Sequence, residues 1–122
     1  MINLILVSHS GKLAEGLKDL LREMAAETPI LLAAGLADGK IGTDVGRIEQ
    51  AFGNISDDAL ILTDIGSATM NAELALELYA GDRDIRFVDV PLVEGGFLAA
   101  VLSGQGKSLD EIITALEAEF KK

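Results

Sequence analysis

The sequence contains no cysteine and a single histidine, His9. Without cysteine the chain can form neither disulfide bonds nor thiolate metal sites, and one imidazole with scattered carboxylates gives no credible transition-metal site. Basic residues are also scarce, with 10 Lys and Arg against 20 Asp and Glu. This balance argues against nucleic acid and anionic membranes as partners, because both bind positively charged protein surfaces.

No apolar run approaches the roughly 18 residues that a membrane-spanning helix needs. The sequence opens on a strand-like run, without the basic segment and apolar stretch of a signal peptide, so we expect none. Together with the lack of cysteine, this favours a cytoplasmic protein. A length of 122 residues suffices for one domain, 1–122, with a hydrophobic core.

The chain is strongly acidic and rich in apolar residues. Its formal net charge is -10, 49% of its residues are hydrophobic, and it has 13 glycines. The negative charge suits a partner with a basic patch, although it also serves solubility alone. The apolar excess indicates either a homodimer interface or a tight core of Ala and Leu.

Four apolar runs predict β-strands over residues 2–7, 30–34, 59–63 and 86–90. They lack strict alternation, which favours strands covered on both faces, as in parallel sheets. Helical patterns follow at about 13–24, 44–52, 68–79, 94–102 and 109–120. This alternation predicts an α/β fold: an open, doubly wound, mainly parallel four-stranded sheet of order 2-1-3-4, flanked by helices.

Residue spacing also predicts the helix caps and the faces that pack on the core. Ser10 and Thr43 are the expected N-caps of the first two helices, and Asp44 suits the positive end of the second. Ser108 and Glu111 form a capping box for the last helix, whose negative end Lys121 and Lys122 would favour. The predicted core-facing stripes are Leu13, Leu17, Leu20, Leu21 and Met24; Val45, Ile48 and Phe52; Met70, Leu74 and Leu78; and Leu109, Ile112, Ile113, Leu116 and Phe120.

His9 lies in a turn, Val7-Ser8-His9-Ser10-Gly11, between the first strand and the first helix, and Asp64 directly follows the third strand. In the order 2-1-3-4 these strands are neighbours, so the two side chains should face one crevice. A neutral imidazole can attack phosphorus with one nitrogen while the other directs its proton to an acceptor such as Asp64. The pattern therefore suggests a phosphoryl carrier, although an exposed histidine and a helix-capping aspartate are simpler interpretations.

Several groups could hold the oxygens of a phosphoryl group on His9. The Ser10 and Ser67 hydroxyls and the backbone N–H groups of Ser10-Gly11 and Gly66-Ser67 are candidates, because turns and helix starts leave such groups unpaired. Thr43 and the loop 39–42 could form another rim of the pocket. A helix cap after a turn is the simpler interpretation of Thr43.

The nucleotide-binding motifs are incomplete. The first turn lacks the glycine fingerprint of dinucleotide sites. Gly106-Lys107-Ser108 is similar to the end of a P-loop, but Val101 stands where the first glycine belongs. We therefore expect no cofactor to be bound by this chain alone.

Four segments in order resemble a known family. They are Val7-Ser8-His9-Ser10, the stretch from Ala33-Ala34-Gly35 through Ile41-Gly42-Thr43-Asp44, Asp64-Ile65-Gly66-Ser67-Ala68, and Pro91-Leu92-Val93-Glu94-Gly95. They are similar to the phosphotransferase subunits of bacterial dihydroxyacetone kinases. Those subunits belong to the mannose-type enzyme IIA group of the phosphoenolpyruvate-dependent phosphotransferase system.

The resemblance implies a definite function. His9 would accept a phosphoryl group from the phosphocarrier protein HPr on Nε2, and Asp64 would orient the ring. The group would pass to ADP held on the kinase's nucleotide-binding subunit, and the ATP formed would phosphorylate dihydroxyacetone on a third subunit. Family members of this type form homodimers. Some relatives carry fused HPr-like and enzyme I-like domains, which are absent up to Lys122, so we expect a separate donor.

Three alternatives remain at the level of sequence. The chain could be an enzyme IIA that serves a mannose-type sugar transporter, with the same chemistry at His9 and a different acceptor. It could be a receiver-like signalling domain phosphorylated on Asp64, although Ser8 and His9 occupy the turn where receivers need acidic magnesium ligands. It could also be a flavodoxin-like binding module without catalytic function.

Overall fold

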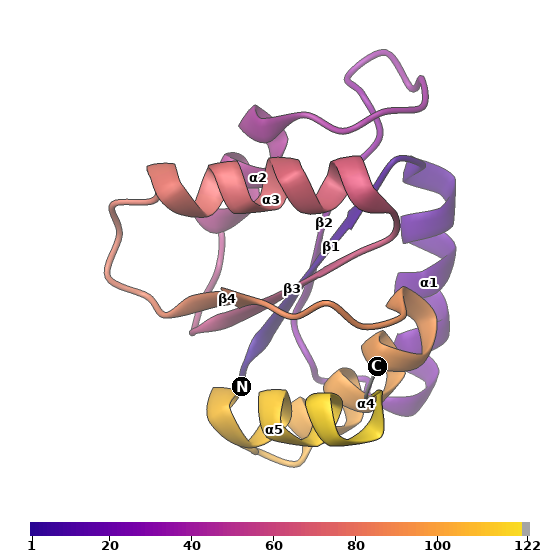
Figure 1. Ribbon diagram of the computed structural model, residues 1–122. Helices are drawn as coiled ribbons and strands as arrows, with labels where there is room; N and C mark the ends of the chain where they lie inside the picture. Colours follow the sequence, from indigo (N-terminus) through magenta and orange to yellow (C-terminus); the bar gives the residue numbers. More distant parts are fainter. Residues whose placement is uncertain (121–122) are drawn as a thin grey trace.

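A parallel four-stranded sheet forms the centre of the molecule (Figure 1). The computed structural model describes residues 1–120. The strands are β1 (Asn3–Ser8), β2 (Ile30–Ala34), β3 (Ala59–Thr63) and β4 (Ile85–Phe87), in the order β2-β1-β3-β4. All three pairings are parallel. The predicted fold class and strand order are therefore confirmed.

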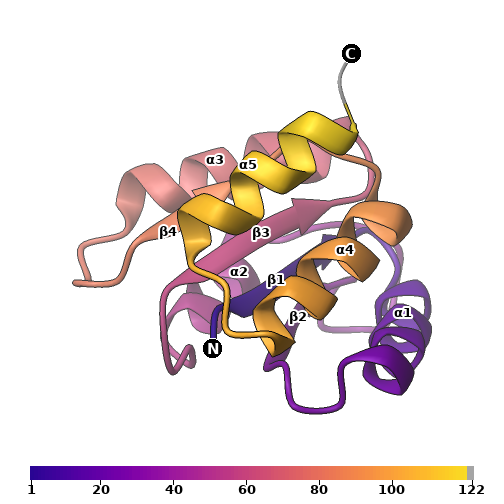
Figure 2. The ribbon, with the colours of Figure 1, turned by 90° about the horizontal axis from the view of Figure 1, so that it is seen from below.

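Helices cover both faces of the sheet (Figures 1 and 2). On one face lie α2 (Val45–Phe52) and α3 (Gly66–Leu78), and on the other lie α1 (Gly11–Met24), α4 (Leu92–Gly104) and α5 (Leu109–Glu119). Two hydrophobic clusters match these layers: one includes Leu17, Leu21 and Ile112, and the other Ile48 and Phe52. Every residue of β1 and β3 is buried, which explains why their sequences lack polar alternation.

Two element boundaries differ from the predicted ones near Pro91. The last strand ends at Phe87 rather than at residue 90, because its ladder with β3 pairs only as far as Ile61 with Phe87. The following helix begins at Leu92 rather than at 94, with Pro91 as its N-cap. Proline needs no N–H partner at a helix start, so it ends the extended segment and permits the helix at once.

The predicted caps are partly correct. Ser10 caps α1 by accepting a hydrogen bond from the Leu13 N–H, and Ser108 and Glu111 form the expected capping box of α5. Thr43, however, does not cap α2. Asp44 is the N-cap, and its carboxylate accepts from the Gly46 N–H at 2.9 Å. The prediction for Lys121 and Lys122 falls outside the described residues.

The predicted stripe of α3 is wrong about which face is covered. Met70, Leu74 and Leu78 are exposed, Met70 by 72%, whereas Ala68, Ala72 and Ala75 pack against the sheet. Small side chains let the helix approach the strands closely. In α1 only Leu17 and Leu21 of the stripe are buried, while Leu13, Leu20 and Met24 are exposed. Within residues 1–120, no helix is long and apolar enough to cross a membrane.

Candidate active site

His9 and Asp64 lie at the carboxyl ends of neighbouring strands. Val7 of β1 pairs with Thr63 of β3, so the turns that follow these strands leave the sheet side by side. The Asp64 N–H donates to the Val7 carbonyl at 3.2 Å, which extends the pairing to the site. Nδ1 of His9 lies 3.0 Å from Oδ1 of Asp64. The structure thus brings His9 and Asp64 together, as the predicted strand order led us to expect.

Asp64 accepts hydrogen bonds on both carboxylate oxygens. Oδ2 accepts from the His9 N–H at 2.9 Å and from the Ser8 hydroxyl at 3.0 Å, and Oδ1 accepts from the Ile65 N–H at 2.7 Å. Burial raises the pKa of Asp64, but the hydrogen bonds from the His9 backbone and ring, Ile65 and Ser8 together hold that pKa below its usual value. Asp64 is therefore an ionised acceptor.

The state of Asp64 fixes the tautomer of His9. A carboxylate can only accept a hydrogen bond, so Nδ1 carries the proton and donates it to Oδ1. In the neutral ring Nε2 then bears the lone pair, and the Ser67 hydroxyl donates its hydrogen bond to that nitrogen. The His9 side chain is 17% exposed and Asp64 16%. Nε2 therefore points away from the carboxylate, toward the exposed Ser67.

The backbone of His9 is hydrogen-bonded at both its N–H and its carbonyl. Its N–H donates to Asp64, and its carbonyl accepts from the Gly42 N–H at 2.8 Å. The buried hydroxyl of Ser8 donates to Asp64 and accepts from the Ser10 N–H at 3.1 Å. Sequence reasoning missed Ser8 as a site residue, and it placed Gly42 on the rim of the pocket without the hydrogen bond to the His9 carbonyl. A serine at the last position of a buried strand, directly before the histidine, was the available signal.

The other predicted site residues lie at the starts of α1 and α3 or in the loop before α2. Gly66 and Ser67 begin α3, whose N-cap residue Ile65 makes no side-chain capping bond, so their N–H groups have no partner within the helix. Gly11 begins α1. The Ser10 oxygen caps that helix, which still leaves its hydroxyl proton available. The Thr43 hydroxyl accepts from Asn71 Nδ2 at 2.5 Å.

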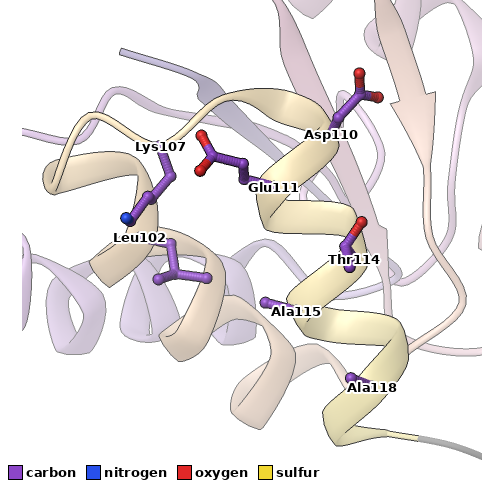
Figure 3. Close-up of a pocket in the computed structure, with 7 residues that line it drawn as sticks. All are labelled: Leu102, Lys107, Asp110, Glu111, Thr114, Ala115 and Ala118. Carbon is purple, nitrogen blue, oxygen red and sulfur yellow. The ribbon is translucent and has the colours of Figure 1, made fainter.

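Two of the surface hollows lie beside the start of α1 and between α4 and α5. One, of about 530 Å³, opens beside the start of α1 and is lined in part by Ser10, Gly11, Lys12 and Arg47. Another, of about 480 Å³, lies between α4 and α5 (Figure 3) and contains no predicted site residue. Among residues 1–120, no group of three or more His, Asp or Glu side chains could hold a metal ion.

Comparison with known proteins identifies the family. The family model described as PTS system fructose IIA component, of the mannose-type enzyme IIA (EIIA-man) group, matches residues 3–113. The chain belongs to this family. The resemblance inferred from the four sequence motifs is thereby confirmed.

Several curated members of the family are similar over nearly the whole chain. A phosphoryl donor subunit DhaM of phosphoenolpyruvate-dependent dihydroxyacetone kinase 2 from Listeria innocua is 40% identical, covering 95% of this chain and 97% of that protein. A phosphotransferase subunit DhaM from Lactococcus lactis is 37% identical, with 93% and 92% covered. The DhaM subunit from Escherichia coli is 39% identical over 98% of this chain, which spans only 28% of that relative.

Solved structures agree on the fold. A crystal structure of a protein of unknown function superposes with a TM-score of 0.88 at 32% identity, covering 99% of this chain and 95% of that one. A phosphotransferase system component EIIA from Streptococcus agalactiae gives a TM-score of 0.71 at 20% identity, covering 97% and 91%. At that identity the second likeness shows the fold alone.

Proposed function

We propose that this chain is the phosphoryl carrier of a phosphoenolpyruvate-dependent dihydroxyacetone kinase. His9 accepts a phosphoryl group from phosphorylated HPr and passes it to ADP held on the nucleotide-binding kinase subunit. The arrangement of three side chains carries this proposal: Asp64 on Nδ1, Ser67 on Nε2, and the imidazole between them. The DhaM relatives, described as phosphoryl donor or phosphotransferase subunits, support it.

In the first step, the lone pair of His9 Nε2 attacks the phosphorus atom of the donor. The bond from phosphorus to the donor's leaving atom breaks as the Nε2–P bond forms. The proton on Nδ1 stays in place, and the carboxylate of Asp64 stabilises the positive charge that develops on the ring. Asp64 thus acts through position and charge rather than as a proton acceptor.

In the second step, an oxygen of the β-phosphate of ADP attacks the same phosphorus. The Nε2–P bond breaks, its electron pair returns to Nε2, and ATP forms on the partner subunit. This chain therefore needs no bound cofactor of its own. Phosphoryl transfer depends mostly on positioning and charge, which suits a site built from one ring, one carboxylate and hydrogen-bond donors.

The donors around Nε2 would hold the phosphoryl oxygens. Ser67 is hydrogen-bonded to Nε2 in this structure and would turn to a phosphoryl oxygen once Nε2 is occupied. The N–H groups of Gly66 and Ser67, at the positive end of α3, are suited to the same charge. The Ser10 N–H already donates to the Ser8 hydroxyl, so the Ser10 hydroxyl and the Gly11 N–H are the second set of donors at the start of α1.

The partners follow from the same proposal. A net charge of -10 suits a donor and an acceptor with basic patches around their own reactive groups. The exposed apolar side chains of α1, α3 and α4 suit the interface of a homodimer. The proposed partners place the protein in the cytoplasm. A sugar-transporter enzyme IIA would use the same chemistry at His9, so only the acceptor distinguishes the two functions.

Transfer of labelled phosphate tests the proposal directly. We expect phosphorylated HPr to label the wild-type chain, and the label to survive alkali and be lost in acid, as phosphohistidine is. His9→Ala should take up no label while keeping its circular dichroism spectrum. Asn54→Ala, a substitution in the turn after α2, should take up label normally. A label on His9→Ala that alkali removes would instead indicate an acyl phosphate on Asp64.

Adding the ADP-loaded kinase subunit to the labelled chain tests the acceptor. We expect the label to appear in ATP, and in dihydroxyacetone phosphate when the third kinase subunit and dihydroxyacetone are added. A phosphohistidine that forms normally but never passes to the kinase subunit would contradict this acceptor and favour a sugar transporter.

A further inference from the structure

A hydrogen bond ties the loop between β2 and α2 to helix α3. Asn71 Nδ2 donates to Thr43 Oγ1 at 2.5 Å, across 28 positions of sequence, and both side chains are half-buried. In Figure 1 this loop rises from β2 above the sheet and returns over α3 before it enters α2. The Thr43 hydroxyl has no role in starting α2, because Asp44 is the N-cap. The bond therefore serves the loop and not the helix.

The residue before Thr43 is the one that holds the carbonyl of His9. The Gly42 N–H donates to that carbonyl at 2.8 Å. Gly42 has a φ of +150°, and a Cβ atom there would lie 3.0 Å from Cγ of Leu36. This conformation is one that side-chain-bearing residues rarely adopt. A defined loop path is thus needed for the Gly42–His9 bond, and the Thr43–Asn71 bond fixes the adjacent residue.

Helix α3 is linked to His9 directly through Ser67 and indirectly through Asn71. Ser67 and Asn71 are four residues apart and so lie on the same side of the helix. Ser67 contacts Nε2 directly, whereas Asn71 reaches His9 through Thr43 and Gly42. Asp64, just before the helix, holds the N–H and Nδ1. The backbone of His9 is thereby fixed at its N–H from the α3 side and at its carbonyl from the loop.

We propose that Asn71 is a positioning residue for phosphoryl transfer. It holds the β2–α2 loop through Thr43, so that Gly42 fixes the His9 carbonyl and Nε2 stays aligned for in-line attack. The inference rests on the proposed function of His9, and it names a residue that does not itself touch the reacting atoms. Since misplacement by about 1 Å can cost roughly 100-fold in rate, loss of this contact should lower the rate of transfer and leave binding of the donor nearly unchanged.

The test removes each half of the contact separately. Asn71→Leu keeps a side chain of similar size without the donor, and Thr43→Val replaces the hydroxyl by a methyl group. We expect each to lower kcat for transfer from phosphorylated HPr by about 10-fold or more, with KM within about twofold. Thr43→Ser, which keeps the hydroxyl, should restore the rate relative to Thr43→Val. Asn54→Ala, which removes an amide that donates to the Gln50 carbonyl four residues earlier, is the matched control.

The double variant distinguishes one shared contact from two separate defects. If Asn71 acts through Thr43, Thr43→Val with Asn71→Leu should be no slower than either single variant. Additive losses, a rate within twofold of wild type in both single variants, or no recovery in Thr43→Ser would each overturn the proposal.

A readout without phosphate separates this proposal from the function of His9. Hydrogen exchange of the Gly42 amide, followed by NMR, should quicken in Asn71→Leu and Thr43→Val, and the ring resonances of His9 should shift. If the wild-type chain accepts no phosphate on His9, the proposed function fails, yet these measurements still decide whether Asn71 positions the loop. An unchanged Gly42 amide and an unchanged His9 spectrum would refute it.

Discussion

Nδ1 of His9 and Oδ1 of Asp64 lie 3.0 Å apart, although 55 residues separate them in the sequence. Two adjacent parallel strands end at the same edge of the sheet and deliver the two side chains there. The same carboxylate also accepts the backbone N–H of His9. One acidic residue therefore sets the main-chain position, the ring orientation and the tautomer of the histidine.

Removal of the Asp64 charge should slow phosphoryl uptake strongly. In Asp64→Asn the neutral amide no longer stabilises the positive charge that develops on the ring, and its NH2 group cannot accept the hydrogen bonds that one carboxylate oxygen accepts here, so we expect uptake to slow by about 10²–10⁴-fold. Single-turnover labelling with phosphorylated HPr measures the rate. Asp110→Asn, on the exposed surface of α5, is the matched control. A rate for Asp64→Asn within twofold of wild type would remove the orienting role.

The lowered pKa of Asp64 makes a prediction about stability and pH. Because the folded pKa lies below the unfolded value near 3.8, ionised Asp64 stabilises the fold above that pH. This contribution is lost as pH falls through the folded pKa, where the unfolded chain already binds the proton. Urea unfolding of wild type and Asp64→Asn should therefore show a stability gap at pH 6 that shrinks below about pH 4. A gap that stayed constant from pH 6 to pH 3 would contradict the assignment.

Loss of the Ser67 hydroxyl should affect chemistry and leave stability intact. The hydroxyl bonds to Nε2 and is a candidate ligand of the phosphoryl group, and a hydrogen bond to a charged group contributes about 1.5–3 kcal/mol. We expect Ser67→Ala to slow transfer by about 10- to 100-fold. The midpoint of thermal unfolding should change little, since Ser67 is exposed and is not the N-cap of α3. Thr114→Ala, also exposed on its helix, controls for the loss of a surface hydroxyl.

The two faces of α3 should respond oppositely to changes in side-chain size. Ala72 is fully buried against the sheet, so Ala72→Leu overpacks the core and should cost about 1–3 kcal/mol of unfolding free energy. Leu74 lies on the exposed face, and Leu74→Ala should change the stability of the monomer by at most about 0.5 kcal/mol. Denaturant unfolding at low protein concentration compares the two. A larger cost for Leu74→Ala than for Ala72→Leu would mean that the helix packs by its leucines.

The strand order and the meeting of His9 with Asp64 could be predicted because both depend on local patterns and on general rules of parallel sheets. Apolar runs mark the strands, and the topology then places the strand ends together. The orientation of α3 could not be predicted in this way. Periodicity finds the Met70, Leu74 and Leu78 stripe but does not show that the alanines are the residues that allow close packing on the sheet.

The contacts that complete the site were beyond sequence reasoning for a different reason. Ser8, Gly42 and Asn71 act through hydrogen bonds whose partners lie on other segments. Which partners meet depends on the path of an irregular loop, and no periodic pattern encodes that path. Thr43 illustrates this limit: its position before a helix indicated a cap, whereas its hydroxyl is used by a residue of α3.

The parallel register of β1 and β3 has a further consequence under the proposed function. Val7 lies opposite Thr63, and a slip by one residue would turn the side chains of one strand to the other face. A misregistered chain could not assemble the imidazole with its carboxylate and would take up no phosphate. Uptake of phosphate would therefore report that β1 and β3 have paired in the native register, because only correctly paired molecules can consume the donor.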